Sequence, residues 1–138
     1  MMLSHLDRTY VAQGAITQRR YVKFGTVDGT VTQAASAADA LIGVCIQPGG
    51  ALDGERVDIR RLGMGEVEYG GNVTRGDRLT SDAQGRAVTA AYHTHTENTA
   101  AAYTQNATTG QASAVFVGGI AEVSGVAGDQ VEALIGRM

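Results

Sequence analysis

The sequence has no tryptophan, one cysteine and one proline, and only 5% of its 138 residues are aromatic. A single cysteine excludes an internal disulfide framework and is typical of a reducing compartment. Because Cys45 lies between Val44 and Ile46, we interpret it as a small buried apolar residue and not as a nucleophile. No apolar run reaches the ~18 residues of a membrane helix, and no charged and then apolar leader begins the chain.

Basic charge is also scarce: the sequence has 11 Lys and Arg residues against 14 Asp and Glu residues, and its net charge is −3. This balance argues against a nucleic-acid binder that works by neutralising phosphates. The chain is instead rich in small residues, with 19 glycines, and no segment keeps a helical period over three turns. We therefore predict a mainly β fold, a compact barrel-like or sandwich-like single domain with at most one short helix, at residues 36–40.

Several segments have the patterns of β-strands. Asp28-Gly29 between two Thr-Val pairs predicts a tight hairpin turn. Residues 41–46 form a short apolar run suited to a buried strand, and residues 56–60 alternate charged and apolar side chains, as a half-exposed strand does. Residues 1–13 have no clean period, so we predict an N-terminal arm over residues 1–15 and a β domain over residues 16–138.

Residues 92–113 form an excursion within this domain, rich in Ala, Thr, Asn and Gln. This segment is too polar for a core and too poor in charge for a solvated tail, which indicates a long loop or an extended hairpin. Tyr103 and Asn106 suit the rim of a polar interface with a partner.

A weak internal repeat links two distant segments. Gly54-Glu55-Arg56-Val57-Asp58-Ile59 resembles Gly128-Asp129-Gln130-Val131-Glu132-Ala133, and an apolar strand precedes each. Gly76-Asp77-Arg78-Leu79 is a third step of the same kind. Glycine permits the positive φ of a turn, and the acid can accept hydrogen bonds from turn amides. We interpret the pattern as a duplicated strand–turn–strand unit, with Val57, Ile59, Leu79 and Val131 facing inward.

His93, His95 and Glu97 are weak candidates for a metal site, because residues two apart in a strand share one face. An exposed polar loop is the favoured interpretation of this segment. The sequence has no Gly-x-Ser-x-Gly motif and no glycine-rich phosphate loop after a strand. We therefore predict no enzymatic activity and no cofactor.

The densest basic positions are Arg19, Arg20, Arg60 and Arg61. The simpler interpretation is a solvated strand face. The alternative is docking onto an acidic partner surface, where arginine pairs with carboxylates through two hydrogen bonds.

Three blocks of the sequence, at residues 40–59, 70–88 and 117–132, carry a resemblance to a known family. The most specific block is Gly76-Asp77-Arg78-Leu79-Thr80-Ser81-Asp82-Ala83-Gln84-Gly85-Arg86-Ala87. In this order the chain resembles the small capsid cement, or head decoration, proteins of tailed bacteriophages and prophages. The match covers residues 24–91 and 114–138, and the N-terminal arm and the excursion depart from it.

The resemblance implies a structural β protein that binds the outside of an assembled capsid and resists the pressure of packaged DNA. Its partners would be the major capsid protein and other copies of itself, with a homotrimer favoured. It would be made in the cytoplasm of the bacterial host and end on the exterior of the virion. One alternative is a surface-binding or carbohydrate-binding β module, although aromatic residues for stacking on sugars are few. A less favoured alternative is a small metal-dependent β-barrel enzyme built on His93, His95 and Glu97.

Overall fold

The computed structural model describes residues 5–91 and 115–136, which form β-strands connected by turns and loops. The strands are β1 (Leu6–Ala12), β2 (Tyr21–Phe24), β3 (Thr30–Gln33), β4 (Leu41–Cys45), β5 (Arg56–Glu68), β6 (Arg78–Ser81), β7 (Ala87–Thr89), β8 (Gly119–Ala121) and β9 (Gln130–Ile135). The prediction of a mainly β fold is confirmed. Among the described residues there is no helix, and so none that could span a membrane.

Residues 36–40, where the sequence allowed at most one short helix, form none. The segment forms a turn in which the Ser36 hydroxyl accepts a hydrogen bond from the Ala38 amide at 3.0 Å. The Asp39 carboxylate accepts another from the Ala35 amide at 2.8 Å. Serine and aspartate side chains satisfy these amides locally, and five residues are too few to nucleate a helix against that competition.

The first five strands close into a barrel in the order β1-β3-β2-β4-β5 and back to β1. β1 pairs in parallel with β3 and antiparallel with β5, and these two pairings join the ends of the sheet. Ten buried residues fill this first barrel: Tyr10, Ala12, Ile16, Val22, Val31, Ile42, Cys45, Ala51, Val57 and Ile59.

The predicted N-terminal arm is therefore corrected, because β1 is one of the walls of the first barrel. Its backbone pairs with β5 from Leu6 opposite Leu62 to Val11 opposite Arg56, with one shift of register between Leu6 and Asp7. Tyr10 and Ala12 point into the core and are 4% and 2% exposed. The polar residues that obscured the strand in the sequence, among them Arg8 and Thr9, are exposed.

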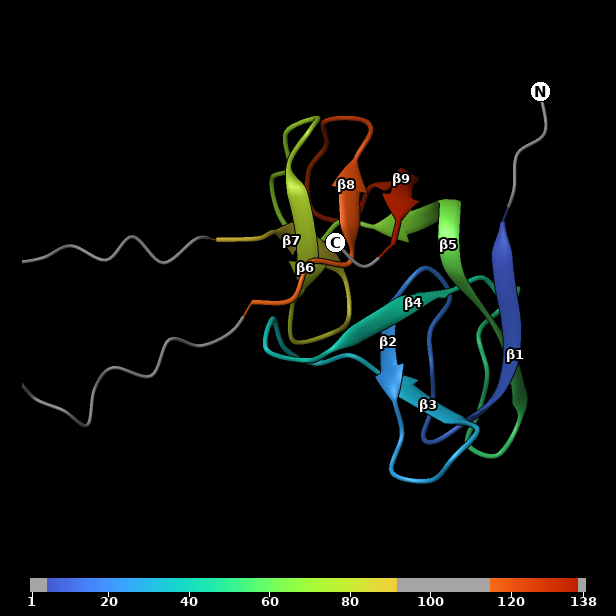
Figure 1. Cartoon of the computed structure of the whole chain (residues 1–138). Helices are drawn as coiled ribbons and strands as arrows, with labels where there is room; N and C mark the ends of the chain where they lie inside the picture. Colours follow the sequence, from blue (N-terminus) through green and yellow to red (C-terminus); the bar gives the residue numbers. More distant parts are fainter. Residues whose placement is uncertain (1–4, 92–114, 137–138) are drawn as a thin grey trace, which may run out of the picture.

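β5 continues out of the first barrel and becomes a wall of a second one. Its first half pairs with β1 and β4, and from Gly63 onward it pairs with β9. The order β5-β9-β8-β6-β7 then closes through a parallel bridge between Tyr69 and Ala87. Figure 1 shows β1–β4 in one group and β6–β9 in another, with β5 passing between them. The two alternating segments that the sequence shows at residues 56–60 and 66–69 thus lie in or directly after one 13-residue strand.

The second barrel repeats the first, strand for strand. Four turns have the same form, and each starts at an isolated bridge and leads into a strand: residues 16–20, 51–55, 73–77 and 125–129. The bridges join these turns in pairs, Ile16 with Ala51 and Val73 with Gly125. The predicted duplication of a strand–turn–strand unit is confirmed, and it extends to the whole five-stranded barrel.

The repeated turn explains the Gly-acid pairs of the sequence. Gly54, Gly76 and Gly128 have φ of 82°, 93° and 93°, a region that favours glycine. The acid that follows each glycine accepts a hydrogen bond from the amide three residues before it, at 2.7 to 3.0 Å: Glu55 from Leu52, Asp77 from Thr74 and Asp129 from Val126.

The fourth turn departs from this pattern. Arg19 occupies the glycine position with a φ of 68°, and the Gln33 side chain accepts the hydrogen bond from Thr17, at 2.9 Å, in place of the missing acid. The same backbone turn is therefore kept with different side chains.

The β2–β3 hairpin is confirmed, but its loop is longer than the tight turn predicted around Asp28-Gly29. β2 ends at Phe24 and β3 begins at Thr30, so Thr26 and Val27 belong to the loop. The Thr26 amide donates to the Gln13 side chain at 2.8 Å, and the Thr30 hydroxyl donates to the Val27 carbonyl at 2.6 Å. These hydrogen bonds hold the loop outside the strand ladder.

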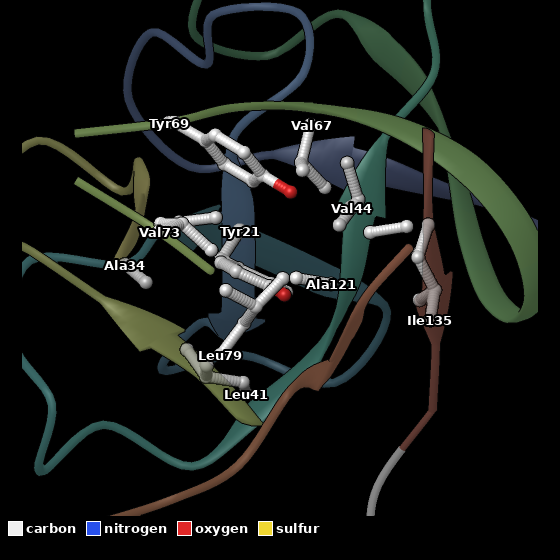
Figure 2. Close-up of a cluster of buried hydrophobic side chains, with 12 residues drawn as sticks. Tyr21, Ala34, Leu41, Val44, Val67, Tyr69, Val73, Leu79, Ala121 and Ile135 are labelled. Atoms are coloured by element: carbon white, nitrogen blue, oxygen red, sulfur yellow. The ribbon is translucent and has the colours of Figure 1, made fainter. Parts of the chain in front are cut away.

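A second hydrophobic cluster fills the second barrel and joins it to the outer face of the first (Figure 2). Tyr21, Ala34, Leu41 and Val44 come from the first barrel, while Tyr69, Leu79 and Ile135 are among those from the second. Val57, Ile59 and Leu79 are fully buried, and Val131 packs against this cluster, so the predicted inward positions are confirmed. The two barrels therefore share both a strand and a core.

Candidate functional site

The four arginines singled out in the sequence have different environments. Arg19 forms an ion pair with Glu66 at 2.7 Å. Arg20 forms one with Glu68 at 3.1 Å and also donates to the Gln84 carbonyl at 2.8 Å. Both partners lie on β5, so these guanidinium groups connect the start of β2 to β5 and are neutralised within the chain.

Arg60 is held still more firmly. It donates two hydrogen bonds to the Asp7 carboxylate, at 2.9 and 3.1 Å, and a third to the Met64 carbonyl at 2.7 Å. The hydrogen bond from Arg60 lowers the pKa of Asp7 below its ordinary value, although partial burial opposes the shift. The pair fastens β1 to β5, and the guanidinium of Arg60 has its charge balanced by Asp7.

Arg61 lies in a different arrangement, which sequence reasoning found only in part. Val57, Ile59 and Arg61 alternate along the inward face of β5, and Arg61 is the first of them not buried in the core. Its Nη1 donates to the Tyr10 hydroxyl at 3.2 Å, and its guanidinium lies 5.5 Å from the centre of the Phe24 ring. Arg61 therefore covers one end of the first barrel.

Arg8 and Phe24 complete this end of the barrel. Arg8 precedes Tyr10 on the inward face of β1, and its guanidinium lies 5.2 Å from the centre of the Tyr10 ring. Tyr10 and Phe24 meet edge to face, with ring centres 6.3 Å apart. We call Arg8, Tyr10, Phe24 and Arg61 the Arg–aromatic cap. Such distances are those of cation–π contacts.

Sequence analysis missed Arg8 and Tyr10 because residues 1–13 were interpreted as an arm, and it did not single out Phe24. The available signal was the spacing of Arg8, Tyr10 and Ala12, which is the period-2 spacing of one strand face. Phe24 follows Val22 at the same spacing. The end of a barrel cannot be recognised from one strand, since it is made by residues of several strands.

The other candidates named from the sequence, His93, His95, Glu97, Tyr103 and Asn106, lie outside the described residues. Within the described part of the chain, no group of three His, Cys, Asp or Glu side chains is placed to hold a metal ion. Cys45 is fully buried in the first barrel, and burial raises the pKa of its thiol. Its environment is therefore that of a packing residue.

The predicted excursion has a defined place in the duplicated fold. It is inserted between β7 and β8, and the equivalent connection in the first barrel, between β3 and β4, is residues 34–40. On the far side of the insertion the Phe116 amide donates to the Ala37 carbonyl at 2.9 Å. The chain therefore returns from the insertion beside the short connection of the first barrel.

Comparison with known proteins identifies a family and solved structures of similar fold. The model of a family described as phage cement protein matches residues 4–119. No curated protein matches the chain. The crystal structure of the head fiber base of bacteriophage phi29 is similar in fold, with a TM-score of 0.65 and 18% sequence identity over 96% of this chain and 94% of that one. At that identity the second similarity concerns the fold alone.

Proposed function

This chain belongs to the phage cement protein family, with a structural role at the capsid, and we propose that it binds the outer surface of the assembled shell. There it holds neighbouring capsid proteins together against the pressure of packaged DNA. The observation that carries the proposal is the family match, which extends over residues 4–119 and so includes the whole first barrel and strands β6 and β7 of the second.

The fold supports a mechanical role. Each barrel has its own buried core, and β5 with the second cluster joins the two into one unit. Ion pairs also attach β5 to other segments. Its residues Glu66 and Glu68 pair with Arg19 and Arg20, which precede β2. Arg60 of β5 pairs with Asp7 of β1. A protein that holds capsid subunits together needs such rigidity, because a flexible connection would let the bound subunits move apart.

The partners in this proposal are the major capsid protein and further copies of the chain. A trimer is the favoured assembly, and the protein is made in the cytoplasm of the host before it joins the virion exterior. It performs no catalysis and needs no cofactor. The excursion over residues 92–113, with Tyr103 and Asn106, supplies a second contact in addition to the barrels.

The experiment is co-sedimentation of the purified full chain with empty shells of a phage that carries it, followed by heating of the decorated and undecorated shells. Saturable binding and a higher temperature of shell disruption are expected. Light scattering of the free protein should give a mass near three times 14.3 kDa. Absence of binding at tens of micromolar protein would overturn the proposed function.

A further inference from the structure

The Arg–aromatic cap presents positive charge that no carboxylate of the described residues neutralises. Within residues 5–91 and 115–136, Arg8 and Arg61 form no ion pair with a carboxylate, whereas Arg19, Arg20 and Arg60 each do. Arg56 and Arg75 also form no ion pair with the described residues, but the arginines of the cap are held in place by aromatic rings. A guanidinium fixed in this way loses little conformational freedom when it binds an anion.

The second barrel shows that folding does not require the cap. The pairing of β1 with β5 in the first barrel is equivalent to the pairing of β5 with β9 in the second. By this equivalence Gly65 corresponds to Arg8, Val67 to Tyr10 and Ile135 to Arg61. Ser81, the third residue after the start of β6, corresponds to Phe24.

All four of these counterparts are buried. The Gly65 position, moreover, lies directly against the Ile135 side chain. The second barrel thus closes its end with small and aliphatic residues, while the first has exposed Arg8 and Phe24 and half-buried Arg61 at this end.

The cap also offers apolar surface beside its charge. Phe24 is 55% exposed although a ring of this size is usually buried. Leu6 and Leu62 face each other at the adjoining end of the β1–β5 ladder and are 56% and 53% exposed. A partner that fits this surface carries a carboxylate next to an apolar side chain.

We propose that the Arg–aromatic cap is the docking surface for such an acidic segment of the capsid shell protein. This inference rests on the proposed function and names the contact through which it operates. The shell is favoured over a second copy of the chain, because a second copy would have to supply a carboxylate that is not already bound. Most carboxylates of the described residues already form ion pairs or hydrogen bonds within the chain. Those with ion pairs or hydrogen bonds are Asp7, Asp39, Asp53, Glu55, Asp58, Glu66, Glu68, Asp77, Asp82 and Asp129.

The test compares two full-length variants that lose the same charge. The cap variant is Arg8→Gln with Arg61→Gln, and the control is Arg56→Gln with Arg75→Gln, two exposed arginines outside the cap. Co-sedimentation with empty shells should show at least about a tenfold weaker affinity for the cap variant. The control should stay within about threefold of the parent. The binding of the parent should weaken with added salt more steeply than that of the cap variant.

The outcomes separate this inference from the proposed function. Failure of the parent itself to bind shells overturns both, whereas equal binding by the parent and the cap variant overturns the cap alone. A change in the mass of the free cap variant in light scattering would assign the surface to contacts between copies and overturn the inference too. If the double variant does not fold, the single variant Arg8→Gln replaces it in the same binding measurement. The Arg8 side chain is exposed and donates no hydrogen bond to the described residues, so its loss should not prevent folding.

Discussion

Gly43 of β4 and Gly119 of β8 occupy equivalent positions in the two barrels, and at each the neighbouring backbone leaves no room for a β-carbon. The atom would collide with the Arg60 carbonyl in the first barrel and with the Leu134 carbonyl in the second. Arg60 and Leu134 are themselves equivalent positions of β5 and β9. The duplication has therefore kept a close approach between strands that only glycine permits.

Substitution of either glycine by alanine should therefore be costly. Gly43→Ala and Gly119→Ala should each lower the free energy of unfolding by about 2–4 kcal/mol, because a backbone carbonyl cannot rotate away as a side chain can. Gly71→Ala is the matched control, since the nearest atom to its new β-carbon would be a Val88 methyl at 4.0 Å. Urea denaturation measures all three, and a loss for Gly71→Ala as large as for the other two would contradict the argument.

Two buried tyrosines should respond in opposite ways to loss of the hydroxyl. The Tyr69 hydroxyl donates to the Val123 carbonyl at 2.6 Å, so Tyr69→Phe should cost about 1–2 kcal/mol. The Tyr21 hydroxyl is buried without a hydrogen-bond partner among the described residues. Tyr21→Phe should therefore leave the free energy of unfolding unchanged or raise it slightly. Equal losses in the two variants would show that Tyr21 has a partner.

Acid should weaken the attachment of β1 to β5. The hydrogen bond from Arg60 lowers the pKa of Asp7 in the folded protein below its ordinary value of 3.8. The pair thus contributes stability above that ordinary value and loses it as the pH falls through the lower folded value. Because the pair is partly exposed, the contribution should be below about 1 kcal/mol.

Melting temperatures from pH 7 to pH 2 test this point. Asp7→Asn should melt lower than the parent at neutral pH, and the two should converge in acid. Asp28→Asn is the control, because Asp28 forms no ion pair or hydrogen bond with the described residues. A constant difference between Asp7→Asn and the parent at every pH would contradict the assigned role.

Truncations at two places should have opposite consequences. Deletion of residues 1–13 removes β1, and with it Tyr10 and Ala12 from the first core, so the protein should melt far lower or fail to fold. Replacement of residues 94–110 by a short Gly-Ser linker should leave the melting temperature nearly unchanged, because the first barrel closes with only residues 34–40 at the same place. Under the proposed function the second variant should bind shells more weakly or lose its oligomeric state. Normal binding and normal mass would confine docking to the barrels.

Local patterns in the sequence were sufficient for part of this structure. The alternation at residues 56–60, the apolar run at residues 41–46 and the Gly-acid pairs each reflect one strand or one turn, and each prediction is confirmed. The weak repeat was visible because Gly54 and Gly128 hold the same turn in both barrels. The hydrogen bond to an acid could be anticipated for the same reason.

Features made by several strands could not be predicted in this way. β1 was missed because Asp7, Arg8 and Thr9 are polar on both faces of the strand, and its pairing partner, β5, lies about fifty residues away. Arg19, Arg20 and Arg60 form ion pairs and Arg61 forms none with the described residues. This difference depends on which carboxylates the fold brings near each arginine. The Arg–aromatic cap needs three strands that meet at one end of a barrel, and no local spacing reveals that meeting.

The continuity of β5 affects how the molecule responds to force, because one uninterrupted strand is a wall of both barrels. Separation of the barrels is opposed by the hydrogen bonds that β5 makes with β1 and β4 on one side and with β9 on the other, and by the hydrophobic cluster to which both barrels contribute. Force applied to the first barrel therefore reaches the second through covalent bonds. Under the proposed function, two contacts of such a body with the shell would be held at a nearly fixed separation, and β5 itself would resist the swelling of the shell.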